Sequence, residues 1–166
     1  MSYSIVFSSR TGNTRQLAET IRETLGEEGL VYFGAPDEAA LQADRLYVGF
    51  WTDKGSCNQE AADFLKTLSG KEVFLFGTAG FGGVASYFDK ILEKARKALP
   101  RDVRVLGTYM CQGKMPMSVR ERYVKMKESP VPVPRMDQMI ENFDKALSHP
   151  DAADLEGLAG AVRSAG

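Results

Sequence analysis

The stretch that decides the fold is Ile5-Val6-Phe7-Ser8-Ser9-Arg10-Thr11-Gly12-Asn13-Thr14, in which a short apolar run passes directly into a polar turn. The apolar run has the composition of a buried strand. Beyond the turn, apolar residues recur at helical spacing with charged residues between them, at Leu17, Ala18, Ile21 and Leu25. One face of this helix can therefore lie on a sheet, and the stretch predicts the first strand and helix of an α/β fold.

The same alternation of apolar runs and helical segments continues along the chain. Further strands are predicted over 30–33, 46–50, 73–76 and 103–110, and helices over 58–68 and 87–95. A last core helix is predicted from the spacing of Met136, Met139, Ile140, Phe143 and Leu147. Together these elements predict a three-layer, doubly wound α/β sandwich around a five-stranded parallel sheet.

Two segments lie outside that plan. Residues 112–135 carry four prolines and a local excess of four positive charges, which predict a long connection with at most a short helix near 119–127. The methionines Met115, Met117 and Met126 form either an adaptable docking face or part of a plain solvated connection. Residues 151–166 predict a weak terminal helix or tail. The length of 166 residues favours a single domain over 1–166.

Composition narrows the classes of partner. The chain carries 21 basic and 22 acidic residues, so it lacks the field that would attract nucleic acid. No apolar run approaches the roughly 18 residues of a membrane span, and we expect no membrane insertion. Two distant cysteines and one histidine offer too few ligands for a metal site, so none is predicted. Free thiols at Cys57 and Cys111 fit the reducing cytoplasm, where we expect the protein to be.

The polar turn after the first strand has the chemistry of an anion site. The start of a helix presents unpaired N–H groups and the positive end of the helix dipole, and hydroxyl side chains with a glycine can wrap a phosphate there. Neither G-x-x-x-x-G-K-[ST] nor G-x-G-x-x-G is present. Taken alone, the turn is also compatible with an ordinary helix N-cap.

The stretch from Ile5 to Thr14 closely resembles the T/S-x-T-G-x-T signature of the flavodoxins. The resemblance extends to the loops that grip the flavin ring in that family, here Trp51-Thr52-Asp53-Lys54-Gly55 and Gly77-Thr78-Ala79-Gly80-Phe81-Gly82. No long insertion splits the last strand, so the chain looks like the short-chain type. The resemblance implies the strand order 2-1-3-4-5 and one FMN bound without a covalent link.

Roles follow from the resemblance. Hydroxyl, amide and backbone groups of the first loop would bind the phosphate, with Gly12 allowing close approach. Backbone groups of 78–80 would meet the pyrimidine edge, and Phe81 would either stack on the flavin or simply pack. Gly55 would turn its carbonyl toward flavin N5 in the one-electron-reduced state. The implied cofactor-binding residues are Ser9, Arg10, Thr11, Gly12, Asn13, Thr14, Trp51, Thr52, Asp53, Lys54, Gly55, Thr78, Ala79, Gly80, Phe81 and Gly82.

The sequence departs from the family at four points. Arg10 places a cation in the phosphate loop, where it either clamps the phosphate or points to solvent. Trp51 comes four residues before Gly55 rather than next to it, so it either shields the flavin or belongs to the core. Lys54 would stabilise reduced, anionic flavin. The nearly neutral charge also differs from the acidic flavodoxins, so partner choice is expected to differ.

The leading expectation is a low-potential electron carrier between redox enzymes, with the cofactor supplying the chemistry and no catalytic residue of its own. The alternative is an FMN-dependent oxidoreductase, either similar to flavodoxin-like protoporphyrinogen oxidases or a subunit assisting a larger flavin reductase. If residues 112–135 enclose the flavin, an enzyme is favoured; if the flavin edge is open, a carrier is favoured. A third possibility is a binding module without FMN.

Overall fold

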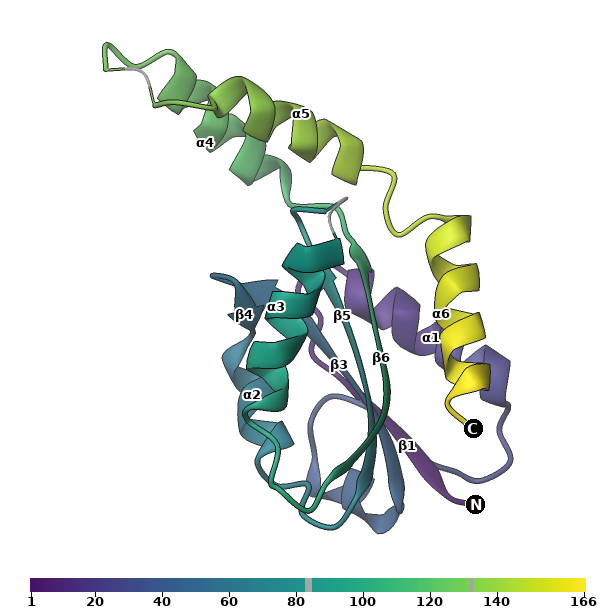
Figure 1. The fold of residues 1–166 in the computed structure, drawn as a ribbon. Coiled ribbons are helices and arrows are strands. Elements are labelled where there is room, and N and C mark those ends of the chain that lie inside the picture. The colour runs from purple at the N-terminus through teal and green to yellow at the C-terminus, as the bar shows by residue number, and fades with distance from the viewer. Residues whose placement is uncertain (83–84, 132) are drawn as a thin grey trace.

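The structure, a computed structural model, describes residues 1–82, 85–131 and 133–166, and its core is a parallel sheet covered by helices (Figure 1). Five parallel strands lie in the order β2-β1-β3-β5-β6. They are β1 (Tyr3–Phe7), β2 (Leu30–Gly34), β3 (Arg45–Asp53), β5 (Glu72–Ala79) and β6 (Arg104–Gln112). The short β4 (Ser56–Cys57) pairs antiparallel with the end of β3. With β4 set apart, the predicted order 2-1-3-4-5 is confirmed.

The two faces of the sheet bury separate apolar cores. In β3, Val48 and Phe50 belong to the core formed with α2 (Gln59–Leu65) and α3 (Ala85–Arg96). The short 3₁₀ helix η1 (Glu38–Gln42) adds Ala40 to the same core. Tyr47 belongs to the opposite core, formed with α1 (Asn13–Leu25) and α6 (Ala152–Ser164). Successive side chains of a strand point to opposite faces, so a strand covered on both sides reads as one continuous apolar run.

The helix that completes the sandwich is α6, and the prediction that the 136–147 helix does so is wrong. That segment forms α5 (Met136–Ala146), which packs on α4 (Met117–Lys127) rather than on the sheet. In its place α6 lies beside α1 and β6, with Leu158 and Val162 fully buried. The Ala- and Gly-rich sequence of α6 gives a weak amphipathic pattern, yet small residues let helices approach closely.

The helices α4 and α5 form an antiparallel hairpin, here called the arm, which projects beyond the carboxyl ends of the strands (Figure 1). The predicted short helix near 119–127 is confirmed by α4, while Pro132 of the predicted connection lies outside the described residues. Phe143 is fully buried, and Arg120 donates to Asp144 at 2.8 Å between the two helices. The arm therefore has packing of its own. No helix in the described part of the chain is long and apolar enough to span a membrane.

Candidate functional site

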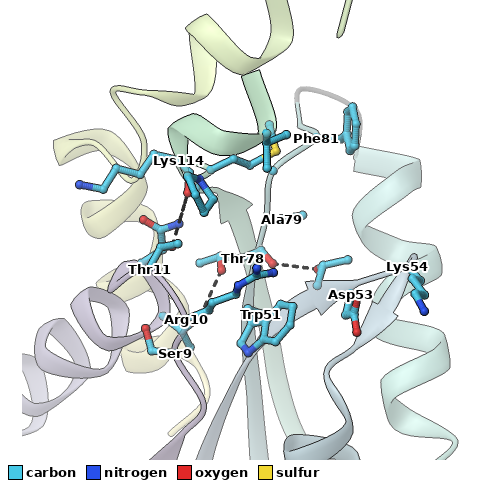
Figure 2. A pocket seen from close by; sticks show the side chains of 18 of the residues that line it. Ser9, Arg10, Thr11, Trp51, Asp53, Lys54, Thr78, Ala79, Phe81 and Lys114 are labelled. Atoms are coloured by element: carbon cyan, nitrogen blue, oxygen red, sulfur yellow. Dashed lines mark hydrogen bonds between the residues drawn. The ribbon is translucent and has the colours of Figure 1, made fainter. Parts of the chain in front are cut away.

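A pocket of about 250 Å³ opens at the carboxyl ends of β1, β3 and β5, where an open α/β sheet is expected to bind its ligand (Figure 2). The three loops singled out from the sequence converge here. Of the predicted binding residues, those that line the pocket are Ser9, Arg10, Thr11, Asn13, Thr14, Trp51, Thr52, Asp53, Lys54, Gly55, Thr78, Ala79, Gly80 and Phe81. Gly12 and Gly82 lie next to it without lining it.

The first loop turns sharply into α1. Gly12 precedes the helix with φ 89°, a left-handed conformation that glycine adopts without a steric penalty. The Ser9 hydroxyl accepts hydrogen bonds from the backbone N–H of Gly12 at 3.1 Å and of Arg15 at 3.3 Å. An oxygen atom thus already sits among the N–H groups at the start of α1. This is the geometry in which a helix N-terminus binds an anion.

Two polar side chains of the same loop hold the walls of the pocket together. Asn13, which is buried, donates from Nδ2 to the carbonyl of Lys114 at 2.8 Å. The Thr14 hydroxyl, also buried, donates to the carbonyl of Phe50 at 3.1 Å and lies 3.2 Å from the hydroxyl of Thr78. The first loop is therefore hydrogen-bonded to β3, to β5 and to the segment that follows β6.

The second loop is a tight hairpin between β3 and β4. Lys54 and Gly55 are its two turn residues, with φ values of 51° and 77°. A two-residue hairpin with both φ values positive is a type I′ turn, which favours glycine and matches the twist of the strands. The Thr52 hydroxyl donates to the carbonyl of Thr78 at 2.8 Å and so joins this hairpin to β5. Gly55 is in the turn and Trp51 is on the strand, which explains their wide separation in sequence.

The pocket lining carries a positive charge excess. It includes the basic residues Arg10, Lys54 and Lys114, and one acidic residue, Asp53. The Arg10 guanidinium lies 5.5 Å from the centre of the Trp51 ring, a cation–π contact in which Arg10 reaches across from the first loop (Figure 2). Arg10 is an exposed residue, and its guanidinium lies over the Trp51 ring. The charge balance favours an anionic ligand.

The third loop, residues 79–82, presents backbone donors to the pocket. The Ala79 carbonyl accepts from the N–H of Gly113 at 2.9 Å, on the β6 side. Because C=O and N–H point in opposite directions in a trans peptide, the N–H of Gly80 points toward the β3 side, where Trp51 to Asp53 line the pocket. Within the described ranges, the N–H of Gly80 donates to no protein group. Phe81, with 39% of its surface exposed, stands at the mouth.

The sequence prediction missed one wall of the pocket. It is formed by Tyr87 of α3 and by the segment after β6, namely Gly113, Lys114, Met115, Pro116 and Val119. One signal was available, since β6 is parallel to β5 and must end at the same edge of the sheet. The contacts themselves join residues about a hundred positions apart, such as Asn13 and Lys114.

The two cysteines and the histidine do not line the pocket. Burial, with a smaller contribution from Asp154 and Asp151, raises the pKa of the Cys111 thiol well above its usual range. Burial also raises the pKa of Cys57. His149 lies 2.6 Å from the Asp154 carboxylate, which together with Asp151 forms the capping box at the start of α6. These polar groups are explained by the helix cap, and the thiols are kept in their unreactive form.

Comparison with known proteins gives consistent results. Residues 4–163 match the model of the flavodoxin domain. A flavodoxin-like domain-containing protein, BilS, from Clostridium symbiosum is 46% identical, with 93% of this chain and 90% of that protein aligned. BilS from Clostridioides difficile is 32% identical over 91% of this chain and 88% of that protein. Flavodoxin 2 from Bacillus cereus shares the fold with a TM-score of 0.57 at 17% identity, covering 99% of this chain and 97% of that one.

Proposed function

Since the chain belongs to the flavodoxin family, we propose that it binds one FMN in the pocket at the ends of β1, β3 and β5 and carries electrons between redox proteins. The observation that carries the proposal is the convergence of all three predicted binding loops on a single positively lined pocket. When bound, FMN supplies reversible one- and two-electron redox chemistry, and the protein supplies binding and orientation. The buried, unpaired thiols fit the cytoplasmic location that we also propose.

The phosphate would be held at the start of α1. There the N–H groups of Gly12 and Arg15 already converge on an oxygen atom, that of Ser9, and a phosphate oxygen presents the same kind of acceptor. Thr11 and Asn13 line the same part of the pocket. Arg10 has its backbone in this loop, so a change of side-chain rotamer brings its guanidinium from Trp51 toward the phosphate.

The ring system would lie between the second and third loops. Trp51 and Phe81 provide aromatic surface at this part of the pocket, and the free N–H of Gly80 offers a donor to a carbonyl oxygen or ring nitrogen. Thr52 and Thr78 keep the two loops in register through their hydrogen bond. Lys54 adds a positive charge at the rim, which favours a cofactor in its reduced, anionic form.

The position of the arm supports a carrier over an enzyme. Among the described residues that follow β6, those that line the pocket belong to the segment before α4 and to the first turn of α4, namely Gly113, Lys114, Met115, Pro116 and Val119. Most of the arm projects away from the strand ends (Figure 1). A pocket with one open side leaves the edge of a ring accessible to another protein. The wall formed by the segment before α4 also favours a second candidate. If a partner protein closes the open side of the pocket, the chain would be an FMN-dependent oxidoreductase or a subunit assisting a larger flavin reductase.

Photoreduction of the purified, FMN-loaded protein separates these functions. A carrier is expected to accept electrons stepwise, with a visible spectrum for the one-electron-reduced form, and to react slowly with NADH, NADPH and quinones. Rapid turnover with any of these small molecules in the absence of a partner would favour the oxidoreductase. A protein that shows no flavin absorbance after incubation with FMN and gel filtration would refute the FMN proposal.

A further inference from the structure

We infer that Asn142, a residue of the arm, is a positioning residue for the cofactor pocket, because together with Gln112 it fixes the Gly80 peptide so that loop 79–82 presents its donors to the ligand. The inference rests on the proposed FMN site and adds to it a residue from outside the three binding loops. Asn142 lies on α5 and does not line the pocket. It therefore acts through Gly80 and not by touching the cofactor.

The Gly80 carbonyl accepts two side-chain hydrogen bonds. Gln112, the last residue of β6, donates from Nε2 at 2.9 Å, and Asn142 donates from Nδ2 at 3.0 Å. The second hydrogen of Gln112 Nε2 is directed to Asn142 Oδ1 at 3.1 Å. Both lone pairs of the carbonyl are thus occupied, and the two amide side chains orient each other. The three groups form a closed network in which no member can rotate alone.

This network determines which way the next amide points. A trans peptide places N–H opposite C=O, so fixing the Gly80 carbonyl toward Gln112 and Asn142 directs the N–H of Phe81 away from them. In the part of the chain that the structure describes, this N–H has no protein acceptor. The preceding peptide is fixed in the same sense, because the Ala79 carbonyl accepts from Gly113. Two consecutive amides are therefore directed away from the arm, and neither has a backbone acceptor among the described residues.

Loop 79–82 packs closely on the side that faces the arm. A Cβ atom at Gly80 would lie 2.5 Å from the Met115 sulfur, and one at Gly82 would lie 2.8 Å from the Gln112 side chain. The backbone consequently lies directly against the base of the arm. On α5, the neighbour of Asn142 is Phe143, which is fully buried and sets the position of the helix. Any displacement of α5 is thus transmitted to the donors of the pocket.

The first test uses the protein without FMN. We expect Asn142→Ala to lower the backbone NMR order parameters of Gly80 and Phe81 from the rigid value of about 0.85 toward the flexible range below about 0.6. Asn142→Asp keeps the size and the acceptor but loses the N–H donor, so the same fall is expected. Gln138→Ala is the matched control, because Gln138 is an exposed amide one turn earlier on α5. Unchanged order parameters in both Asn142 variants, or an equal fall in the control, would overturn the inference.

The second test measures FMN affinity through the fluorescence of Trp51, the single tryptophan of the chain. Losing one positioning hydrogen bond is expected to raise the Kd for FMN about tenfold in Asn142→Ala, and to leave it within about twofold in Gln138→Ala. A Kd unchanged in Asn142→Ala would contradict the positioning role. The proposed function can fail while this inference stands. In that case the unaltered protein would bind no FMN, but the order parameters of Gly80 and Phe81 would still fall in the Asn142 variants.

Discussion

Replacing Thr14 with valine removes two hydrogen bonds that join the first loop to β3 and β5. The Thr14 hydroxyl is buried, donates to the Phe50 carbonyl at 3.1 Å and lies 3.2 Å from the Thr78 hydroxyl. Valine has nearly the same shape, so no cavity forms and the loss is confined to hydrogen bonding. Each buried hydrogen bond contributes about 1 kcal/mol, and the free energy of unfolding should fall by about 2 kcal/mol.

The change is measurable by urea unfolding, which gives the free energy, and by thermal unfolding, which gives Tm, each followed by circular dichroism. For a chain of 166 residues, a loss of about 2 kcal/mol corresponds to a fall in Tm of roughly 4–8 °C. Thr20→Val on the same helix is the control, because the Thr20 hydroxyl donates to the carbonyl of Gln16 within its own helix. That variant should change the unfolding free energy by less than about 0.5 kcal/mol. If Thr14→Val were no less stable than Thr20→Val, the Thr14 bonds would not hold the pocket walls together.

Three further predictions concern α6, the thiols and the rim of the pocket. Leu158→Ala should lower the free energy of unfolding by about 2–5 kcal/mol, whereas Leu147→Ala, at a half-exposed site, should lower it far less. Equal losses for the two variants in chemical denaturation would contradict the role of α6 as a sandwich helix. Because the pKa of Cys111 is raised in the folded state, its thiol should resist Ellman's reagent at pH 8 until the protein unfolds. For the same reason the free energy of unfolding should decline as the pH rises above about 8.5, where the thiol ionises in the unfolded chain. Fast labelling of the native protein at both cysteines would refute this. Lys54→Ala should make the midpoint potential of the FMN-loaded protein more negative, because it removes a positive charge that stabilises reduced flavin. Lys97→Ala removes an exposed charge outside the pocket and should leave the potential unchanged. Equal potentials for the two variants in potentiometric titrations would exclude the effect of Lys54.

The parts of the site that lie close together in sequence were predictable. The first loop joins a buried strand to an amphipathic helix within a dozen residues, and local pattern alone indicates both elements and the anion site between them. The loops ending in Gly55 and Gly82 follow buried strands of a parallel sheet, so their carboxyl ends meet at one edge. The resemblance to the flavodoxins then supplied the ligand that physical reasoning left open.

The helix assignment shows what a pattern cannot provide. The segment 136–147 has a strong apolar face, but such a face indicates only that something covers it. In the structure the cover is α4, and the sheet is covered by α6, whose small residues give little periodic signal. Helix formation was foreseen at both places, but the sheet was assigned to the 136–147 helix, and the 151–166 segment was expected to be only a weak terminal helix or tail.

The missed pocket wall has a different cause. Gly113 to Pro116 and Val119 line the pocket, and this wall is held by the bonds of Asn13 to Lys114 and of Gly80 to Gln112 and Asn142. These contacts connect segments that are distant in sequence, and no local pattern encodes them. The Arg10 contact with Trp51 is of the same kind, since it depends on a rotamer that crosses the pocket.

Titration of the FMN-free protein with FMN tests the central claim most directly. Trp51 lines the pocket and is the single tryptophan, so its fluorescence reports on this site alone. Our account predicts saturable quenching at one FMN per chain, with flavin absorbance that remains with the protein through gel filtration. Fluorescence that does not respond to FMN, with all flavin absorbance lost on the column, would contradict it.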